Sequence, residues 1–188
     1  MHCGEPSTHD RLSAWAGRHL PATVVNVVSN LGLDVNLSTL SGEVRPLSQW
    51  LTTFHLASVV LDPYTNESSW VLDPATRILQ GFRDSSARVN LVVTSDAAGA
   101  RSFLGPLADE YMVFCDPDRS LVRSLGLDQL PAFVFILSDG SIKASAQGWN
   151  PPEWKTVADA IAEVTSWLAP VVPGPNDPGA FQGTAALG

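Results

Sequence analysis

The stretch LGLDQLPAFVFILSDGSIKASAQG, residues 125–148, decides the fold. An apolar residue precedes Pro131, a continuous apolar run occupies 132–137, and an Asp-Gly pair leads into a second extended run at 141–147. Such an apolar run is typical of a strand buried on both faces of a sheet, and Asp-Gly is typical of a tight hairpin turn. The segment therefore predicts a β-hairpin within a covered sheet.

Upstream of this hairpin, apolar strands alternate with segments of helical spacing. We expect further strands at 56–61, 89–93 and 112–115, and helices at 70–82, 98–111, 119–125 and 153–168. The run at 33–40 alternates apolar and polar residues and ends at a Ser-Gly turn, which predicts a hairpin ahead of the main sheet. This order predicts an α/β fold, with a central mixed β-sheet covered by helices on both faces.

The chain divides into three parts by composition. Residues 1–32 are an N-terminal extension, with a short helix expected in the first twenty residues and an apolar β-branched run at 22–28. Residues 33–168 form the domain. Residues 169–188 are rich in Pro and Gly, so we expect an extended tail that adds nothing to the core and serves a partner instead.

Length and charge exclude several classes of function. The 188 residues fit one domain, and the formal net charge of −8 disfavours nucleic acid and anionic membranes, because phosphate binding needs a surplus of Lys and Arg. The longest early apolar run is too short to span a bilayer, and no signal peptide is evident. We expect a soluble, cytoplasmic protein without membrane insertion, whose Cys3 and Cys115 are reduced.

Two stretches resemble a known superfamily. Residues 125–148 resemble the second half of thioredoxins, in which the residue equivalent to Pro131 follows a cis peptide bond. The run LSTLSGEVRPLS at 37–48, followed by LASVVLD at 56–62, is similar to the opening of TlpA-type thiol-disulfide oxidoreductases and AhpC/TSA-type peroxiredoxins. The resemblance covers residues 33–168 and implies a thioredoxin-like fold with a cis Leu130–Pro131 bond.

The same resemblance exposes a departure at the catalytic position. Matching the Trp-Cys-x-x-Cys turn of these relatives places Ser68 at the nucleophilic cysteine and Val71 at the resolving one. Matching the peroxiredoxin pattern Thr-x-x-Cys to Thr65-Asn-Glu-Ser68 again gives a serine. A helix N-terminus can ionise a thiol, but a serine hydroxyl needs an adjacent base and forms no disulfide. Ser68 is therefore interpreted as a helix cap or a remnant, and its catalytic role is a weak alternative.

Three further candidates have a functional and a structural interpretation. Asp62 matches the buried acid that accepts a proton in thioredoxins, or it simply ends a strand. Cys115 is expected at the end of a strand, where sites gather, although burial as a small apolar residue is favoured. Cys3 lies near His2 and His9, but three residues at a terminus are weak evidence for a metal, and we expect none.

The resemblance also implies a mode of partner binding. In this superfamily the backbone beside the cis proline pairs with an extended peptide as an added strand. The first hypothesis is accordingly a redox-inactive protein-interaction, assembly or regulatory module that needs no cofactor. Alternatives are a divergent thiol oxidoreductase or peroxidase using Cys115 or Cys3, and a structural subunit that docks through its tail. The expected binding groove comprises Tyr64, Ser68, Ser69, Trp70, Leu130, Pro131 and Trp149.

Overall fold

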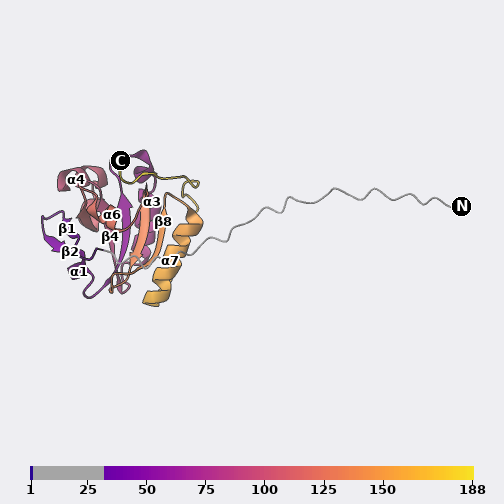
Figure 1. Ribbon diagram of the computed structural model, residues 1–188, viewed down its shortest axis with the longest axis horizontal. Coiled ribbons are helices and arrows are strands. Elements are labelled where there is room, and N and C mark those ends of the chain that lie inside the picture. The colour runs from indigo at the N-terminus through magenta and orange to yellow at the C-terminus, as the bar shows by residue number, and fades with distance from the viewer. Residues whose placement is uncertain (2–31) are drawn as a thin grey trace.

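The computed structural model describes Met1 and residues 32–188 (Figure 1). The helix and the β-branched run expected before residue 29 lie outside the described residues. The described chain forms a mixed α/β fold around one large sheet, as the alternation of strands and helices predicts.

The sheet has seven strands in the order β2-β1-β5-β4-β3-β7-β8. Strands β3, β4 and β5 run parallel, while β1 is antiparallel to β5 and β7 is antiparallel to both β3 and β8. The pair β1–β2 is the expected N-terminal hairpin. The bounds are β1 Asn36–Thr39, β2 Val44–Pro46, β3 His55–Leu61, β4 Ala87–Val93, β5 Met112–Cys115, β7 Ala132–Ile136 and β8 Ile142–Gln147.

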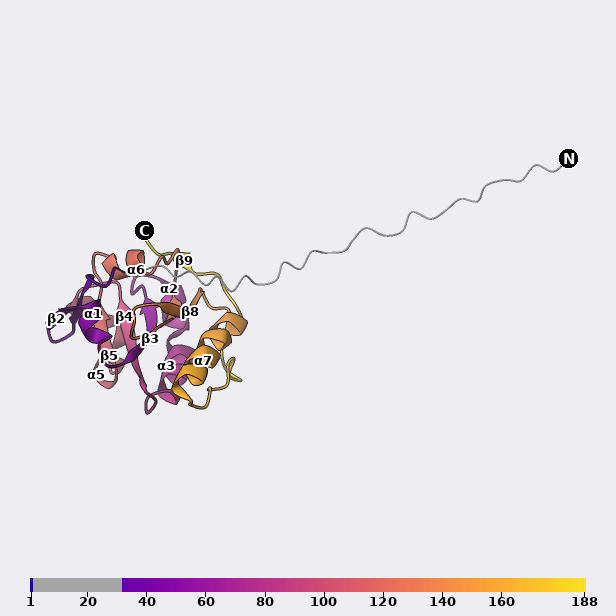
Figure 2. The ribbon, with the colours of Figure 1, turned by 60° about the horizontal axis from the view of Figure 1, so that its bottom comes forward.

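Helices cover both faces of this sheet because its central strands are apolar on both sides. Alternate residues of β3 face opposite cores: Val59 and Leu61 lie in one, Leu56 and Val60 in the other. The first core lies under α3, α4, α5 and α7, and the second under α1 and α6 (Figures 1 and 2). The bounds are α1 Leu47–Trp50, α2 Asn66–Trp70, α3 Leu72–Gly81, α4 Ala97–Leu104, α5 Leu107–Glu110, α6 Ser120–Ser124 and α7 Pro151–Thr165.

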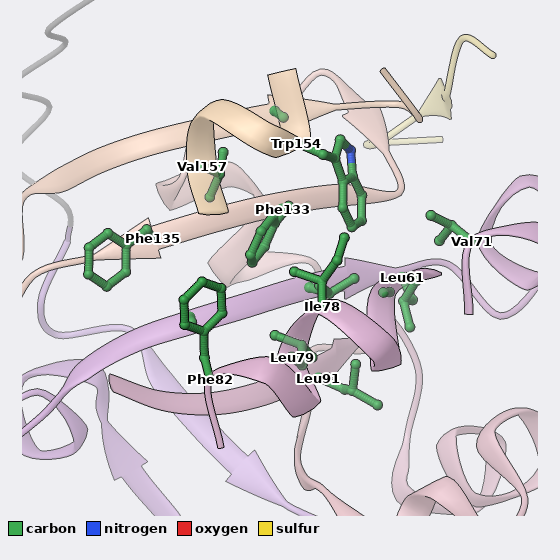
Figure 3. Close-up of a cluster of buried hydrophobic side chains, with 14 of the residues drawn as sticks. Leu61, Val71, Ile78, Leu79, Phe82, Leu91, Phe133, Phe135, Trp154 and Val157 are labelled. Carbon is green, nitrogen blue, oxygen red and sulfur yellow. The ribbon is translucent and has the colours of Figure 1, made fainter. Parts of the chain in front are cut away.

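Aromatic side chains fill the first core between α3, α7 and the sheet. Figure 3 shows Ile78 of α3 and Phe82, the residue after α3, pointing toward Phe133 of β7 and Trp154 of α7. The Phe133 and Trp154 rings are 5.1 Å apart, and the Trp154 indole N–H donates to the Gly148 carbonyl at 2.8 Å. The buried indole thus has its polar atom satisfied, as burial of tryptophan requires.

Three expected helices have clearly different bounds in the structure. The helix expected at 98–111 is two helices, α4 and α5, because Gly105 takes a positive φ of 54° and Pro106 follows it. The helix expected at 70–82 is divided into α2 and α3 at Val71, because Pro74 has no N–H with which to continue the hydrogen-bond ladder. The helix expected at 153–168 begins at Pro151 and ends at Thr165, because Ser166 takes a left-handed conformation with φ of 52°. Residue 168 therefore lies outside the helix, and the Leu168 side chain is exposed.

The Leu130–Pro131 peptide bond is cis, which confirms the prediction from the resemblance. Pro131 follows the two-residue strand β6, Gln129–Leu130, and leads into β7. Its carbonyl accepts a hydrogen bond from the Gly148 amide at 2.8 Å, so the start of β7 and the end of β8 are held together at the open end of the hairpin.

The prediction that residues 169–188 add nothing to the core is wrong. After α7 the tail crosses α3, where the Arg77 guanidinium donates to the Val171 carbonyl at 2.6 Å and pairs with the Asp177 carboxylate at 2.5 Å. The Val172 side chain is buried in the first core, and Ala186 is fully buried in the second.

Beyond Asp177 the tail lies along the edge beside Pro131. The amide and carbonyl of Phe181 exchange hydrogen bonds with those of Trp149, each 2.9 Å long. Residues Thr184–Ala185 then form β9, which is antiparallel to β6. These contacts join backbone groups, so they need no apolar periodicity, and a Pro/Gly-rich sequence can make them.

Two glycines of the tail provide a matched test of this seating. A Cβ at Gly183 would lie 2.6 Å from the Leu130 carbonyl oxygen, whereas a Cβ at Gly179 would meet nothing within 4 Å. We predict that Gly183→Ala loosens the tail and speeds chymotryptic cleavage after Phe181 about tenfold, since about 1.4 kcal/mol of local opening corresponds to that factor. Gly179→Ala should cleave at the wild-type rate, and mass spectrometry of the released peptide measures both. Equal rates for the two variants would contradict the seating.

Candidate functional site

Ser68 lies at the turn from β3 into α2, where the resemblance places the nucleophile. It is the third residue of α2 and is fully buried. Its Oγ accepts hydrogen bonds from the Asp62 amide at 2.8 Å and from the Thr65 hydroxyl at 3.3 Å. The serine oxygen therefore joins the end of the strand to the first turn of the helix, which is a structural role.

Among the side chains that the structure describes, no carboxylate and no imidazole is hydrogen-bonded to the Ser68 hydroxyl, and the Asp62 carboxylate binds Tyr64 and Arg119 instead. The one histidine within residues 32–188 is His55, at the opposite end of β3, about 20 Å away for a strand of this length. Its Nδ1 accepts a hydrogen bond from the Ser138 amide at 3.0 Å, so the ring joins the start of β3 to the turn after β7. Because a serine nucleophile needs a base within hydrogen-bond reach, this arrangement cannot activate Ser68.

Asp62 follows directly after β3, and its carboxylate is almost fully buried. One oxygen accepts from the Tyr64 amide at 3.0 Å, and the other pairs with the Arg119 guanidinium at 2.9 Å. Burying a charge is costly unless it is paired and hydrogen-bonded, and both conditions hold here. The acid is thus held by partners within its own chain.

Arg119 is a residue of this site that sequence reasoning missed. It stands at the N-cap of α6 in a left-handed conformation with φ of 56°. Its second terminal nitrogen donates to the Ala186 carbonyl at 2.5 Å, so one side chain joins Asp62 to the tail. The available signal was the Asp116-Pro-Asp-Arg119 sequence before α6, in which Asp116 caps the helix through the Leu121 and Val122 amides.

Cys115 lies at the carboxyl end of β5, and it is buried as expected. It is opposite Val93 of β4, which is opposite Leu61 of β3, so about 10 Å of sheet separates the Cys115 and Leu61 backbones. Burial raises the pKa of the Cys115 thiol, the Asp96 carboxylate adds to the rise, and Arg101 opposes it. A buried thiol with a raised pKa is a poor nucleophile near neutral pH.

The expected groove residues divide by exposure. Ser68, Leu130, Pro131 and Trp149 are buried, while Tyr64, Ser69 and Trp70 are exposed. Within the buried set, Leu130 pairs with Thr184 of β9.

The tail covers the buried part of this groove. The Trp149 indole N–H donates to the Pro178 carbonyl at 2.9 Å, and the exposed Trp70 ring contacts Phe181 edge-on at 5.5 Å. Figure 2 shows β9 beside α2 and α6 at this end of the sheet. The edge beside Pro131 is therefore occupied by the chain's own C-terminal segment, which sequence reasoning did not foresee.

The structure offers no metal site in the part of the chain that it describes. No three His, Cys, Asp or Glu side chains within residues 32–188 are grouped to hold an ion. Cys3, His2 and His9 lie outside the described residues. None of the described helices is both long and apolar enough to cross a bilayer.

Comparison with solved structures supports the thioredoxin-like fold. A secreted disulfide oxidoreductase of Mycobacterium tuberculosis, homologous to E. coli DsbE, superposes with a TM-score of 0.53 at 18% identity and covers 70% of this chain and 96% of its own. The bacterioferritin comigratory protein of Xanthomonas campestris gives a TM-score of 0.56 at 13% identity, with 71% and 92% covered.

The exposed lipoprotein thioredoxin of Streptococcus pneumoniae gives 0.53 at 17% identity, with 71% of this chain and 98% of its own covered. No protein-family model and no curated protein matches the chain by sequence. At these identities the likeness is one of fold. The chain has the thioredoxin-like fold that DsbE-type oxidoreductases and peroxiredoxin-type proteins share.

Proposed function

We propose that this chain is a thioredoxin-fold protein without dithiol or peroxidase activity, which works as a protein-interaction module in an assembly or regulatory role. The observation that carries the proposal is the burial and hydrogen bonding of the Ser68 side chain. Its oxygen is fully buried and bridges Asp62 and Thr65, at the position where the resemblance calls for a nucleophilic cysteine.

The second cysteine does not compensate for this loss. Cys115 is buried two strands from β3, and the pKa of its thiol is raised by that burial. A divergent thiol enzyme that uses Cys115 would need this side chain to reach solvent and to ionise, and its surroundings favour neither. The use of Cys3 stays an untested alternative.

The surface around the former catalytic turn favours an interaction role. Tyr64 is 77% exposed, Trp70 54% and Leu187 52%, and Trp70 also contacts the tail through Phe181. Large exposed aromatic side chains are typical of interfaces, where they bury much area at low entropic cost. We propose a protein partner that binds at this end of the sheet, beside Pro131 and the tail. The cytoplasmic location expected from the sequence stays a prediction.

The redox half of the proposal predicts no catalysis. With dithiothreitol as reductant, the full chain should not speed insulin reduction, and it should not consume peroxide above the uncatalysed rate. Cys115→Ser and Cys3→Ser should leave both rates unchanged, because no thiol acts. Activity above background that either substitution abolishes would overturn the proposal and favour the divergent oxidoreductase.

The interaction half predicts a local effect of surface substitutions. Proteins that co-purify with the full chain from its native source should be lost with Tyr64→Ala/Trp70→Ala. They should be retained with Val44→Ala, because Val44 is also exposed, at 60%, but lies in β2 at the far edge of the sheet. Quantitative mass spectrometry of the three eluates measures the difference. Equal recovery with both variants would place the interface elsewhere.

A further inference from the structure

The edge beside Pro131 is filled by a short segment of this chain that binds as an extended peptide would. Residues 178–186 run antiparallel to it and form backbone hydrogen bonds with Trp149 and with Asp128, whose carbonyl accepts from the Ala186 amide at 2.8 Å. Between these points, Thr184 lies opposite Leu130 in the β6–β9 pair. The segment is thus held as an added strand.

We propose that residues 178–188 are a tethered pseudo-ligand, which a partner's extended peptide of the pattern aromatic-x-Gly-x-x-Ala displaces. The inference rests on the proposed function, because it names the sequence class of the partner and the regulation of the same surface. The tail then sets the minimum affinity that a partner peptide needs, because only a peptide that displaces the tail can bind beside Pro131.

The pattern follows from three contacts of the tail. The Phe181 ring packs against the first core and meets Trp70 edge-on, so an aromatic residue fits there. At Gly183 any Cβ would lie 2.6 Å from the Leu130 oxygen, so only glycine fits. Ala186 is fully buried and its carbonyl accepts from Arg119, so a small residue is needed at that position.

The positions between these anchors are open to variation. Gln182 and Ala185 are exposed, and Thr184 is only partly buried. A partner could therefore carry other residues at the Gln182 and Ala185 positions without losing a buried contact. At the Thr184 position it would lose only the hydrogen bond that the hydroxyl donates to the Leu130 carbonyl at 3.4 Å. This alternation of anchored and free positions is typical of peptides that bind as an added strand.

The part of the tail that follows Asp177 is the part that we expect to open. Asp177 is held by Arg77 and also accepts from the Gly174 amide at 2.7 Å, which fixes the part of the tail over α3. Beyond this anchor only β9, two residues long, pairs with the domain as a regular strand. A short, edge-bound segment of this kind opens at lower free energy than the sheet beneath it, so it can leave while the fold stays intact.

A tethered competitor lowers the apparent affinity of a free peptide in proportion to the fraction of time that the edge is open. The direct test is a fluorescently labelled peptide of residues 178–188, titrated with full-length protein in a Cys3→Ser background and followed by anisotropy. Phe181→Ala in the protein's own tail should tighten binding of the wild-type peptide at least about tenfold, because the tail competes less well. Gly183→Ala should act in the same direction, and circular dichroism checks that both variants are folded.

A covalent lock supplies the opposite change. Gln129 and Ala185 are opposed across β6 and β9, and facing residues of an antiparallel pair lie within disulfide distance. Gln129→Cys/Ala185→Cys, oxidised within one chain, should lose peptide binding, and reduction should restore the level of the unlocked protein. A peptide in which valine replaces the glycine equivalent to Gly183 should not bind any form.

The outcomes separate this inference from the proposed function. Equal binding to the oxidised and reduced lock, or no gain with Phe181→Ala and Gly183→Ala, would overturn the pseudo-ligand. A lock that cross-links two copies would show that tails are exchanged between chains, and it would also overturn the intramolecular arrangement. Catalysis in the insulin or peroxide assays would overturn the proposed function alone, because the lock measures peptide binding and not redox chemistry.

Discussion

The Arg119 guanidinium satisfies a buried charge and fixes the end of the chain at the same time. One of its terminal nitrogens pairs with the Asp62 carboxylate, of which only 6% of the side chain is exposed, and the other binds the Ala186 carbonyl. Without the arginine, Asp62 would be a buried charge short of a partner, which typically costs on the order of 3–5 kcal/mol. The left-handed backbone at Arg119, between the Asp116 cap and α6, brings its side chain to the ends of both β3 and the tail. The turn between β3 and α2, the sheet and the C-terminal tail are thereby joined.

The central part of the fold could be predicted because its signals are local. The apolar runs at 56–61 and 132–137 became β3 and β7, and the Asp-Gly pair became the turn between β7 and β8. The cis bond before Pro131 followed from the resemblance. Burial of Cys115 was also foreseen, because a small apolar residue that ends a strand usually lies inside.

The candidate site was less predictable, because its decisive contacts join backbone groups far apart in sequence. Nothing in the spacing of Phe181 and Gly183 indicates that they lie beside Trp149 and Leu130. The Pro/Gly composition of the tail is equally typical of an extended strap and of a free end. Arg119 was overlooked because the Asp116-Pro-Asp-Arg119 sequence indicates the start of a helix but not that the arginine pairs with Asp62, which is 57 residues away. These pairings become visible only when the fold places the tail beside β6 and beside Trp149, which follows β8.

The contacts of the tail and the serine at the matched cysteine position bear on the same proposal. A serine lies at the position where the resemblance places the nucleophile, and the tail covers the edge beside Pro131. Under the proposed function, both features favour controlled binding over turnover. Under the proposed function, the exposed Tyr64 and Trp70 beside the covered edge supply the surface on which a partner docks.

The measurement closest to this account is amide hydrogen exchange of the full-length protein, resolved residue by residue by NMR. The Phe181 amide donates to the Trp149 carbonyl and the Ala186 amide to the Asp128 carbonyl. Both should exchange at least about tenfold more slowly than the same residues in a free peptide of the tail sequence, because hydrogen-bonded amides exchange only when the segment opens. Exchange at the free-peptide rate would show that the tail is not seated beside Pro131, and it would contradict the account.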